Sequence, residues 1–362
     1  MSNFNRWLKL YNDNNLLEFS RDDQALVWLK LKSIVRKEWL ESFVVYANLQ
    51  VKSKTLNKQW QELYNALADH PKAHQLLDTF IRAENRKVAL ALPVEQLVSE
   101  LYKMRNFDWG GNYQNNLDRY IVDNFIKTIP SFDLISQKIN TEIALSVAGY
   151  VLCSWYNHWS SILIEHLFKE HDKVLPTVGM IKKVDFFVDQ VPFDLKVTYL
   201  PVGYIAEQRR KRGLKSEIAE LRTYAKTYGV HFDRDTNDET QAYEISQKLL
   251  DAKKSEASII HMARNKILIE AQQHPQELIQ WLYENQGERR FDASNRIFII
   301  LVDTTDWDAS WKLKRNLDLL RPAIHQWITR FSKRKLESLH LRFKFDSKSY
   351  ECFSDAIFVI KE

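Results

Sequence analysis

The spacing of apolar residues changes along the chain. Through the first 135 residues, apolar positions recur every three or four residues, as in 26–34 and 60–67, and this period predicts amphipathic helices. Later segments are short and rich in β-branched and aromatic residues, which predicts strands at 183–188, 191–199, 297–302, 339–345 and 356–360. Helical patterns at 214–228, 243–272 and 311–331 lie between them. The second part is therefore expected to be a layered α/β domain.

The length of 362 residues predicts about two domains. The best boundary is Pro130–Asp133, where a proline and a potential helix cap precede a long uncharged helix. We therefore expect an all-helical region over 1–135, used for recognition or dimerisation, and an α/β domain over 136–362.

Composition removes several classes of protein. Only 8 residues are glycine, and neither the G-x-G-x-x-G nor the G-x-x-x-x-G-K-[ST] pattern occurs, which argues against a nucleotide-driven motor or a dinucleotide enzyme. Cys153 and Cys352 lie far apart, so neither a disulfide framework nor a cysteine-rich zinc site is expected. A reducing, cytoplasmic location follows from this cysteine usage.

The segment Ile143–Ile164 contains 22 residues and no formal charge, which is long enough to span a bilayer. Its serine, asparagine and histidine residues suit a helix buried in protein better than one that faces lipid. No signal peptide is recognised at the start of the chain. The sequence therefore predicts no membrane association.

The most informative segment is 184–198, Val-Asp-Phe-Phe-Val-Asp-Gln-Val-Pro-Phe-Asp-Leu-Lys-Val-Thr. If Asp189 and Gln190 form a two-residue turn, counting outward places Asp185 directly opposite Asp194. Strand alternation then places Lys196 on the same side, with an unbroken apolar surface on the other. Asp189 is assigned to the turn, where aspartate is common, rather than to the site.

Two carboxylates opposed on an antiparallel pair repel each other unless something offsets their charge. A divalent cation is the natural compensation, and Mg²⁺ takes one or two carboxylates together with water and substrate phosphate. Such an ion stabilises charge on a phosphate oxygen and favours an attacking hydroxide. Lys196 would orient the water or offset charge on the pentavalent phosphorus. On the plainer alternative, the hairpin is an edge ribbon whose two aspartates are separated by water.

An acid, a short spacer and then Asp-x-Lys on the adjoining strand resemble the PD-(D/E)xK nuclease superfamily, which includes restriction endonucleases and repair nucleases. The resemblance covers about residues 140 to 230, and Val184 stands where the family often has proline. It implies a restriction-endonuclease-like core, a mixed sheet flanked by helices. It also implies Mg²⁺, with Mn²⁺ as a substitute, held by Asp185 and Asp194, with Lys196 as the catalytic lysine.

Many members of this superfamily add a glutamate from the helix before the hairpin. By that resemblance Glu165 is the fourth catalytic residue, and Glu170 is its competitor. A charge on a helix is more often part of its solvated face, so the choice stays open.

A basic segment follows the predicted hairpin. From Ile205 to Lys226 there are seven basic and three acidic residues, a net charge of +4. The expected nucleic-acid-binding residues are Arg209, Arg210, Lys211, Arg212 and Lys215. Cations next to a phosphodiester-cleaving site would hold a nucleic-acid backbone and release counterions. A solvated surface explains the same charge run equally well.

Together these features predict a magnesium-dependent DNA endonuclease, with a type II restriction endonuclease as the leading choice because the chain carries no ATPase motif. The resemblance implies double-stranded DNA as substrate, a homodimer to cut both strands, and a companion DNA methyltransferase. A repair or recombination nuclease is the alternative within the class. A non-catalytic nucleic-acid-binding protein is the alternative outside it.

Overall fold

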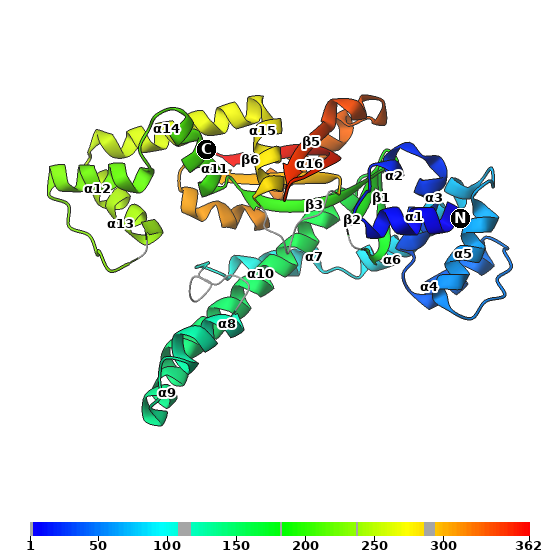
Figure 1. Ribbon diagram of the computed structural model, residues 1–362, viewed down its shortest axis with the longest axis horizontal. Coiled ribbons are helices and arrows are strands. Elements are labelled where there is room, and N and C mark those ends of the chain that lie inside the picture. Colours follow the sequence, from blue (N-terminus) through cyan, green and yellow to red (C-terminus); the bar gives the residue numbers. More distant parts are fainter. Residues whose placement is uncertain (1–2, 108–116, 182, 237, 286–293) are drawn as a thin grey trace. The chain divides into compact units, whose positions relative to one another are not determined.

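The computed structural model describes residues 3–107, 117–181, 183–236, 238–285 and 294–362 (Figure 1). The chain divides into two compact units, each assembled from segments that are distant in sequence. Unit 1 comprises Met1–Ala25, Val191–Trp307 and Ser332–Glu362, and unit 2 comprises Leu26–Gln190 and Asp308–Phe331. The predicted boundary near residue 135 lies inside unit 2, and it stays a prediction.

Unit 1 is built on four strands in the order β3-β4-β6-β5. Their bounds are β3 Val191–Tyr199, β4 Arg296–Asp303, β5 His340–Phe345 and β6 Lys348–Lys361. β4 runs parallel to both β3 and β6, whereas β5 pairs antiparallel with β6. All eight residues of β4 are buried, as expected of a central parallel strand covered on both faces.

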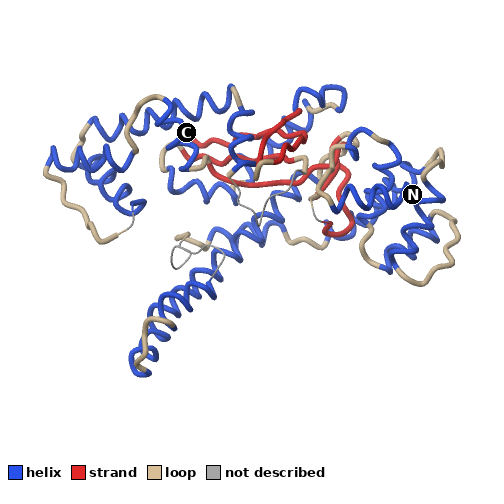
Figure 2. The backbone as a smooth tube through the Cα atoms, in the orientation of Figure 1, coloured by secondary structure: helices blue, strands red, loops and turns tan. Residues whose placement is uncertain are grey.

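Helices pack on one face of this sheet. They are α11 (Val202–Lys211), α14 (Ser255–Gln273) and α15 (Pro275–Glu284), which join Phe298, Ile300 and Val302 of β4 in one apolar core. Figure 2 shows the strands in red and these helices in blue. A smaller cluster joins α12 (Glu217–Tyr228), α13 (Asp238–Asp251) and the start of α14. The short helices α1 (Asn3–Asn12) and α2 (Glu18–Arg21) complete the unit.

Unit 2 is mostly helical. Its elements are α3 (Asp23–Ser33, whose first residues belong to unit 1), α4 (Lys37–Tyr46), α5 (Leu56–Leu67), α6 (Ala73–Leu90), α7 (Val94–Tyr102), α8 (Leu117–Ile121), η1 (Val122–Ile126), α9 (Phe132–Lys138), η2 (Ile139–Ile143), α10 (Ala144–Lys169), η4 (Trp307–Arg315, from its second residue) and α16 (Leu317–Arg330). The side chain of Ser131 accepts a hydrogen bond from the backbone N–H of Leu134, so the predicted cap is present, at the start of α9 rather than of α10, the long uncharged helix. Near the end of α10, Phe168 stacks on Phe186 with 4.6 Å between ring centroids.

Two strands also belong to unit 2, β1 (Val174–Ile181) and β2 (Val184–Val188), which pair antiparallel. Their register is regular up to Pro176 opposite Phe186 and resumes only at Ile181 opposite Val184. Gly179 lies in this irregular stretch, and glycine is required there because a Cβ atom would lie 2.1 Å from Val35 Cγ2. The pattern of apolar residues missed β1, whose proline and glycine interrupt the usual strand signal.

The other predicted strands are confirmed, each to within a few residues except β6, which begins eight residues earlier. The single helix expected over 243–272 is wrong, because α13 and α14 are separated at Lys253, which has φ +52°. α10 covers the uncharged segment 144–164. In the described part of the chain, no helix combines the length and apolar character needed to cross a membrane.

The pattern of apolar residues did not predict three further helices: α11, α15 and the 3-10 helix η5 (Lys333–Leu339). The first two contribute to the core on the unit 1 sheet. Mixed α/β architecture is therefore confirmed, with parallel and antiparallel strand pairs in one protein.

Candidate active site

The predicted two-residue turn is present. β2 ends at Val188 and β3 begins at Val191, and the residues between them, Asp189 and Gln190, have φ values of +47° and +69°. Positive φ at both central residues defines a type I′ turn, which usually contains Asn-Gly or Asp-Gly. A glutamine in the left-handed region costs about 1 kcal/mol or more relative to glycine, so other contacts must hold this turn. The opposition of Asp185 and Asp194 follows from counting outward and stays a prediction.

The apolar side predicted for the hairpin is buried. Val184, Phe186 and Val188 of β2 are at most 1% exposed, and Val191 and Phe193 of β3 are fully buried. These residues alternate with Asp185 and Asp194 along their strands. Leu195 and Val197, also predicted on this side, are half-buried, and Phe187 on the side of Asp185 is buried as well. The alternation therefore places the aspartates on the face opposite these apolar residues, but burial is not confined to one face.

Asp185 lies where the pairing of β1 with β2 is interrupted. Its neighbours Val184 and Phe186 are both paired with β1, but four residues of β1, 177–180, separate their partners. Thr177 Oγ1 donates a hydrogen bond to the backbone carbonyl of Asp185 at 3.2 Å. The Asp185 residue is half-buried. A bulge of this kind redirects side chains and is common next to functional sites.

Asp194 is buried, and both of its oxygens contact cations. Oδ1 lies 2.7 Å from Lys196 Nζ, and Oδ2 lies 3.0 Å from Arg296 Nε. The two cations differ in freedom, since the Lys196 side chain is 45% exposed whereas that of Arg296 is fully buried. Lys196 is thus able to move away from the carboxylate, and Arg296 is not.

The parallel pairing of β3 with β4 positions Asp194. Asp194 lies opposite Arg296 in the register, and its N–H donates to the carbonyl of Asn295 at 2.9 Å. The buried Asn295 side chain donates to the Pro192 carbonyl and accepts from the N–H of Phe353. Arg296 lies 4.9 Å from the ring centre of Tyr283, and burial raises the pKa of that phenol, which therefore stays protonated. The carboxylate sits on a rigid support.

This donor set fits a magnesium ion with a restriction. Because the fully buried Arg296 already donates to Oδ2, Oδ1 is the more available ligand atom of Asp194, and an ion bound there would displace the Lys196 ammonium. Mg²⁺ commonly uses one or two carboxylates and fills its remaining positions with water and phosphate oxygens. Within the described ranges, no three His, Cys, Asp or Glu side chains are grouped to hold a metal ion. A site of two aspartates would therefore depend on water and substrate for the rest.

The two glutamates at the end of α10 already have partners within unit 2. Glu165 Oε2 lies 3.0 Å from Lys169 Nζ, one turn along the helix. Glu170 pairs with His166 at 3.1 Å and with Arg321 of α16. Glu165 is half-buried and, among the described residues, has an ion pair within its own helix alone, whereas Glu170 joins two helices. The contacts favour Glu165 as the less constrained of the two, and its catalytic role stays a prediction.

The basic segment divides into buried and exposed members. Arg209 is 1% exposed and pairs with Glu220 at 2.8 Å, while its Nε donates to the Lys215 carbonyl. This arginine therefore joins α11 to α12, which differs from the phosphate-contacting role expected of it. Arg210, Lys211 and Lys215 are exposed. The Lys211 ammonium pairs with Glu207 on its own helix at 3.0 Å.

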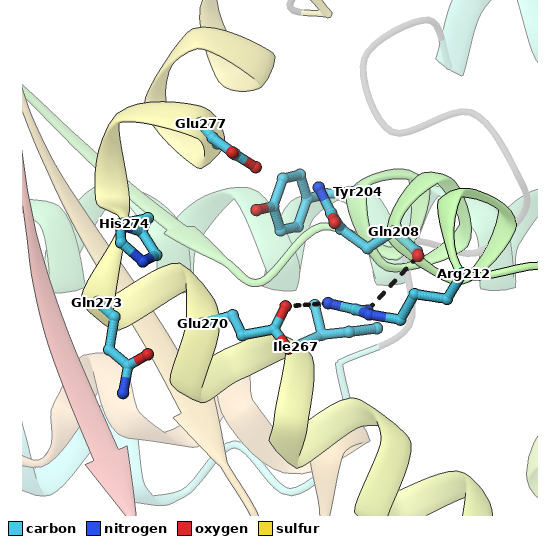
Figure 3. Close-up of a pocket in the computed structure, with 8 residues that line it drawn as sticks. All are labelled: Tyr204, Gln208, Arg212, Ile267, Glu270, Gln273, His274 and Glu277. Carbon is cyan, nitrogen blue, oxygen red and sulfur yellow. Dashed lines mark hydrogen bonds and ion pairs between the residues drawn. The ribbon is translucent and has the colours of Figure 1, made fainter.

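Arg212 forms part of a pocket of about 230 Å³ between α11, α14 and α15 (Figure 3). Its guanidinium pairs with Glu270. In the same pocket, burial and the nearby Glu277 carboxylate raise the pKa of Tyr204 to about 12. Tyr204 thus remains a neutral phenol. Because Arg212 pairs with Glu270, it is less available to a phosphate than its exposed neighbours.

Sequence reasoning missed Arg296. The signal was present, because a single arginine opens the otherwise apolar run Arg296–Val302. A charge at the edge of a fully buried strand requires a partner, and an acid on a neighbouring parallel strand is the natural one. The sequence alone did not show which strand adjoins β4.

Comparison of the chain with protein-family models, with curated proteins and with solved structures found no match. The function is therefore inferred from the residues of the chain and their contacts.

Proposed function

We propose that this protein is a magnesium-dependent endonuclease that hydrolyses DNA phosphodiester bonds. Asp185 and Asp194 would hold the ion, Lys196 would serve the attacking water, and Glu165 would assist. The finer proposal is a type II restriction endonuclease acting as a homodimer on double-stranded DNA, alongside a methyltransferase that protects the host sequence.

The observation that carries the proposal is the contact between Lys196 and Asp194. A buried carboxylate on a rigid strand holds a half-exposed ammonium at 2.7 Å through the oxygen that is not bound to arginine. A simple structural pair does not need the second cation, because Arg296 already neutralises the aspartate. An ammonium that can be released is suited to a site where a metal ion and a phosphate arrive together.

The two-residue turn supports the role of Asp185. Regular pairing outward from a type I′ turn would bring the third residue before Val188 opposite the third residue after Val191, and these residues are Asp185 and Asp194.

The protein residues have distinct tasks in this mechanism. Mg²⁺, when bound, supplies Lewis-acid stabilisation of the phosphate and lowers the pKa of a coordinated water. Asp185 and Asp194 fix the position of that charge. Lys196, displaced from Oδ1, donates hydrogen bonds to the attacking water or to a non-bridging phosphate oxygen. The attacking water would lose a proton to solvent as it adds to phosphorus, the bond to the leaving ester oxygen would break, and that oxygen would take up a proton from solvent, so that one water is consumed per bond.

Exposed cations on unit 1 support DNA as the partner. Arg210 and Lys215 are exposed and have no ion pair among the described residues. They lie only eleven and sixteen positions after Tyr199, the last residue of β3. Phosphate contacts of this kind position a duplex without reading its sequence, and they make binding dependent on salt.

The test is incubation of the full chain with supercoiled plasmid and with phage-length linear DNA, in Mg²⁺, in Mn²⁺ and in EDTA. Metal-dependent cleavage into a fixed set of fragments is expected of a restriction endonuclease. Metal-dependent cleavage confined to branched, nicked or damaged substrates would indicate a repair nuclease instead of a restriction endonuclease. Asp185→Asn should abolish either activity while the circular dichroism spectrum is unchanged, and unchanged cleavage by that variant would reject the site.

A non-catalytic nucleic-acid-binding protein is the second candidate, and one contact favours it. Arg296 already pairs with Asp194, so the carboxylate is satisfied without a metal ion. On this alternative, DNA binding persists in EDTA, no strand is cut with either ion, and Asp185→Asn leaves the affinity unchanged. The cleavage assay and a binding assay on the same samples separate the two candidates.

A further inference from the structure

A buried lysine of unit 2 contacts the turn between β2 and β3. The Lys30 side chain, on α3, is fully buried. Its Nζ donates to Asp78 Oδ1 at 2.5 Å, to Gln190 Oε1 at 2.5 Å and to His74 Nδ1 at 3.1 Å. Asp78 and His74 lie one turn apart on α6, so the ammonium joins two helices to the second residue of the turn.

Gln190 is held at both ends of its amide. While Oε1 accepts from Lys30, Nε2 donates to Asp78 Oδ2 at 3.3 Å. The glutamine side chain therefore completes a closed network of Lys30, Asp78 and Gln190. Its backbone has φ +69°, a conformation that favours glycine. The hydrogen bonds of the network therefore offset the cost of the positive φ at Gln190, a cost that glycine would not have.

A buried ammonium is costly to desolvate, and an apolar side chain of similar size would avoid that cost. Polar networks of this kind are retained in some proteins because they select one register over its neighbours. Register matters here, because a slip of one residue along a strand moves every side chain to the opposite face. A slip at this turn would move Asp185 to the face of β2 that Val184, Phe186 and Val188 occupy.

We infer that the Lys30–Asp78–Gln190 network is a positioning device that fixes the conformation of the turn at Asp189–Gln190, directly after the strand that carries Asp185. This inference rests on the proposed function, since it assigns the network to the same metal site. Lys30 touches no substrate or metal ion; it acts through the turn.

The test is a double-mutant cycle between Lys30→Met and Gln190→Gly. Glycine adopts the turn conformation without help, so it removes the need for the network. We expect Lys30→Met to lower the rate of Mg²⁺-dependent DNA cleavage about tenfold or more in the wild-type background and less than about threefold in the Gln190→Gly background. Equal losses in both backgrounds would show that Lys30 contributes only general stability, and would overturn the inference.

Lys32→Met is the matched control on the same helix. The Lys32 ammonium lies 3.5 Å from the ring centre of Trp60, a residue of α5 rather than of the turn, and burial lowers the pKa of Lys32 to about 8. Its effect should be the same in both backgrounds. Where Lys30→Met fails to fold, Asp78→Asn takes its place in the cycle, because the Asp78 side chain is 22% exposed and contacts both Lys30 and Gln190.

Amide hydrogen exchange of residues 188–191 is measured on the same variants. Lys30→Met should speed exchange at the turn more than in α10, and Gln190→Gly should cancel that difference. This readout does not depend on cleavage. If the protein cuts no DNA but shows this exchange pattern, the proposed function is wrong and the role of the network in the turn is supported. If the protein cuts DNA but Lys30→Met leaves the exchange pattern unchanged, the role of the network is wrong and the proposed function is supported.

Discussion

Two aspartates of unit 1 each hold a lysine at 2.7 Å, but their surroundings differ. Asp194 lies within β3 and pairs with Lys196 and with the buried Arg296 of the adjacent strand. Asp303 ends β4 and pairs with Lys361 at the end of β6. The other oxygen of Asp303 accepts from the hydroxyl and N–H of Thr305 and from the N–H of Asp306.

The difference separates a structural aspartate from a candidate ligand. The hydrogen bonds to Asp303 come from the residues that follow it, as in an aspartate that stabilises a strand-to-loop turn. Asp194 has no such local role. One of its charged partners, Lys196, lies two positions further along the same strand, and the other, Arg296, lies on the neighbouring strand. An acid with a lysine nearby is therefore insufficient to define a site. What distinguishes Asp194 is one oxygen fixed by a buried cation and one held by a releasable ammonium.

The largest effect is expected from Asp194→Asn compared with Asp303→Asn. The first variant should lose metal-dependent DNA cleavage on the order of 10³-fold, because a neutral amide is a poor ligand for Mg²⁺. The second should retain cleavage within about twofold of the wild type. Steady-state cleavage rates of both purified proteins provide the measurement. Equal losses in the two variants would erase the distinction between the aspartates.

A large effect on stability is expected from Arg296→Met. Removal of this cation leaves the Asp194 carboxylate buried beside a partly exposed lysine, and breaking a buried pair typically costs about 3–5 kcal/mol. Lys361→Met should cost about 1 kcal/mol or less, because that ammonium is 47% exposed. Urea unfolding followed by tryptophan fluorescence measures both. A cost for Arg296→Met no larger than for Lys361→Met would contradict the rigid support assigned to Asp194.

A smaller loss of activity is expected from Lys196→Ala. Loss of the ammonium should slow cleavage by about 10²-fold, since the group acts on the water or transition state rather than holding the ion. Lys361→Ala should leave the rate unchanged, and Lys196→Arg should restore little because a planar guanidinium differs in shape from an ammonium. Single-turnover cleavage at saturating Mg²⁺ measures the effect. A wild-type rate for Lys196→Ala would remove this lysine from the mechanism.

The smallest effect is a pH dependence that belongs to Asp303. Burial acts to raise the pKa of this aspartate, but hydrogen bonds from Lys361, Thr305 and Asp306 hold it below its usual value of 3.8. The folded state therefore binds fewer protons than the unfolded state, and this stabilisation is present above pH 3.8 and is lost as pH falls through the folded pKa. Asp303→Asn should reduce the acid-induced loss of stability as pH falls below about 4, measured by thermal unfolding. An unchanged pH profile would contradict the assignment.

Local features of the site could be predicted from the sequence, and tertiary ones could not. The alternation of Val184, Phe186 and Val188 around Asp185 indicated the strand, its buried face and the turn that follows. Neighbouring strands were beyond prediction, because pairing of β3 with β4 joins residues about 100 positions apart. The partner of Asp194, Arg296, was missed for that reason.

The basic segment shows the same limit. Its net charge indicated a binding surface, but the sequence did not reveal that Arg209 is buried against Glu220 while Arg210 is exposed. Helical periodicity separates the faces of α11 only when the direction of the core is known. The network at Lys30 was likewise invisible, since α3, α6 and the turn are far apart in the chain.

The most direct measurement is Mn²⁺ binding to the full chain, detected by electron paramagnetic resonance with and without a DNA duplex. We predict that Asp185→Asn and Asp194→Asn each weaken binding at least about tenfold relative to the wild type, while Asp303→Asn binds as the wild type does. Equal Mn²⁺ binding by the wild type and both site variants would show that these two aspartates do not hold the ion.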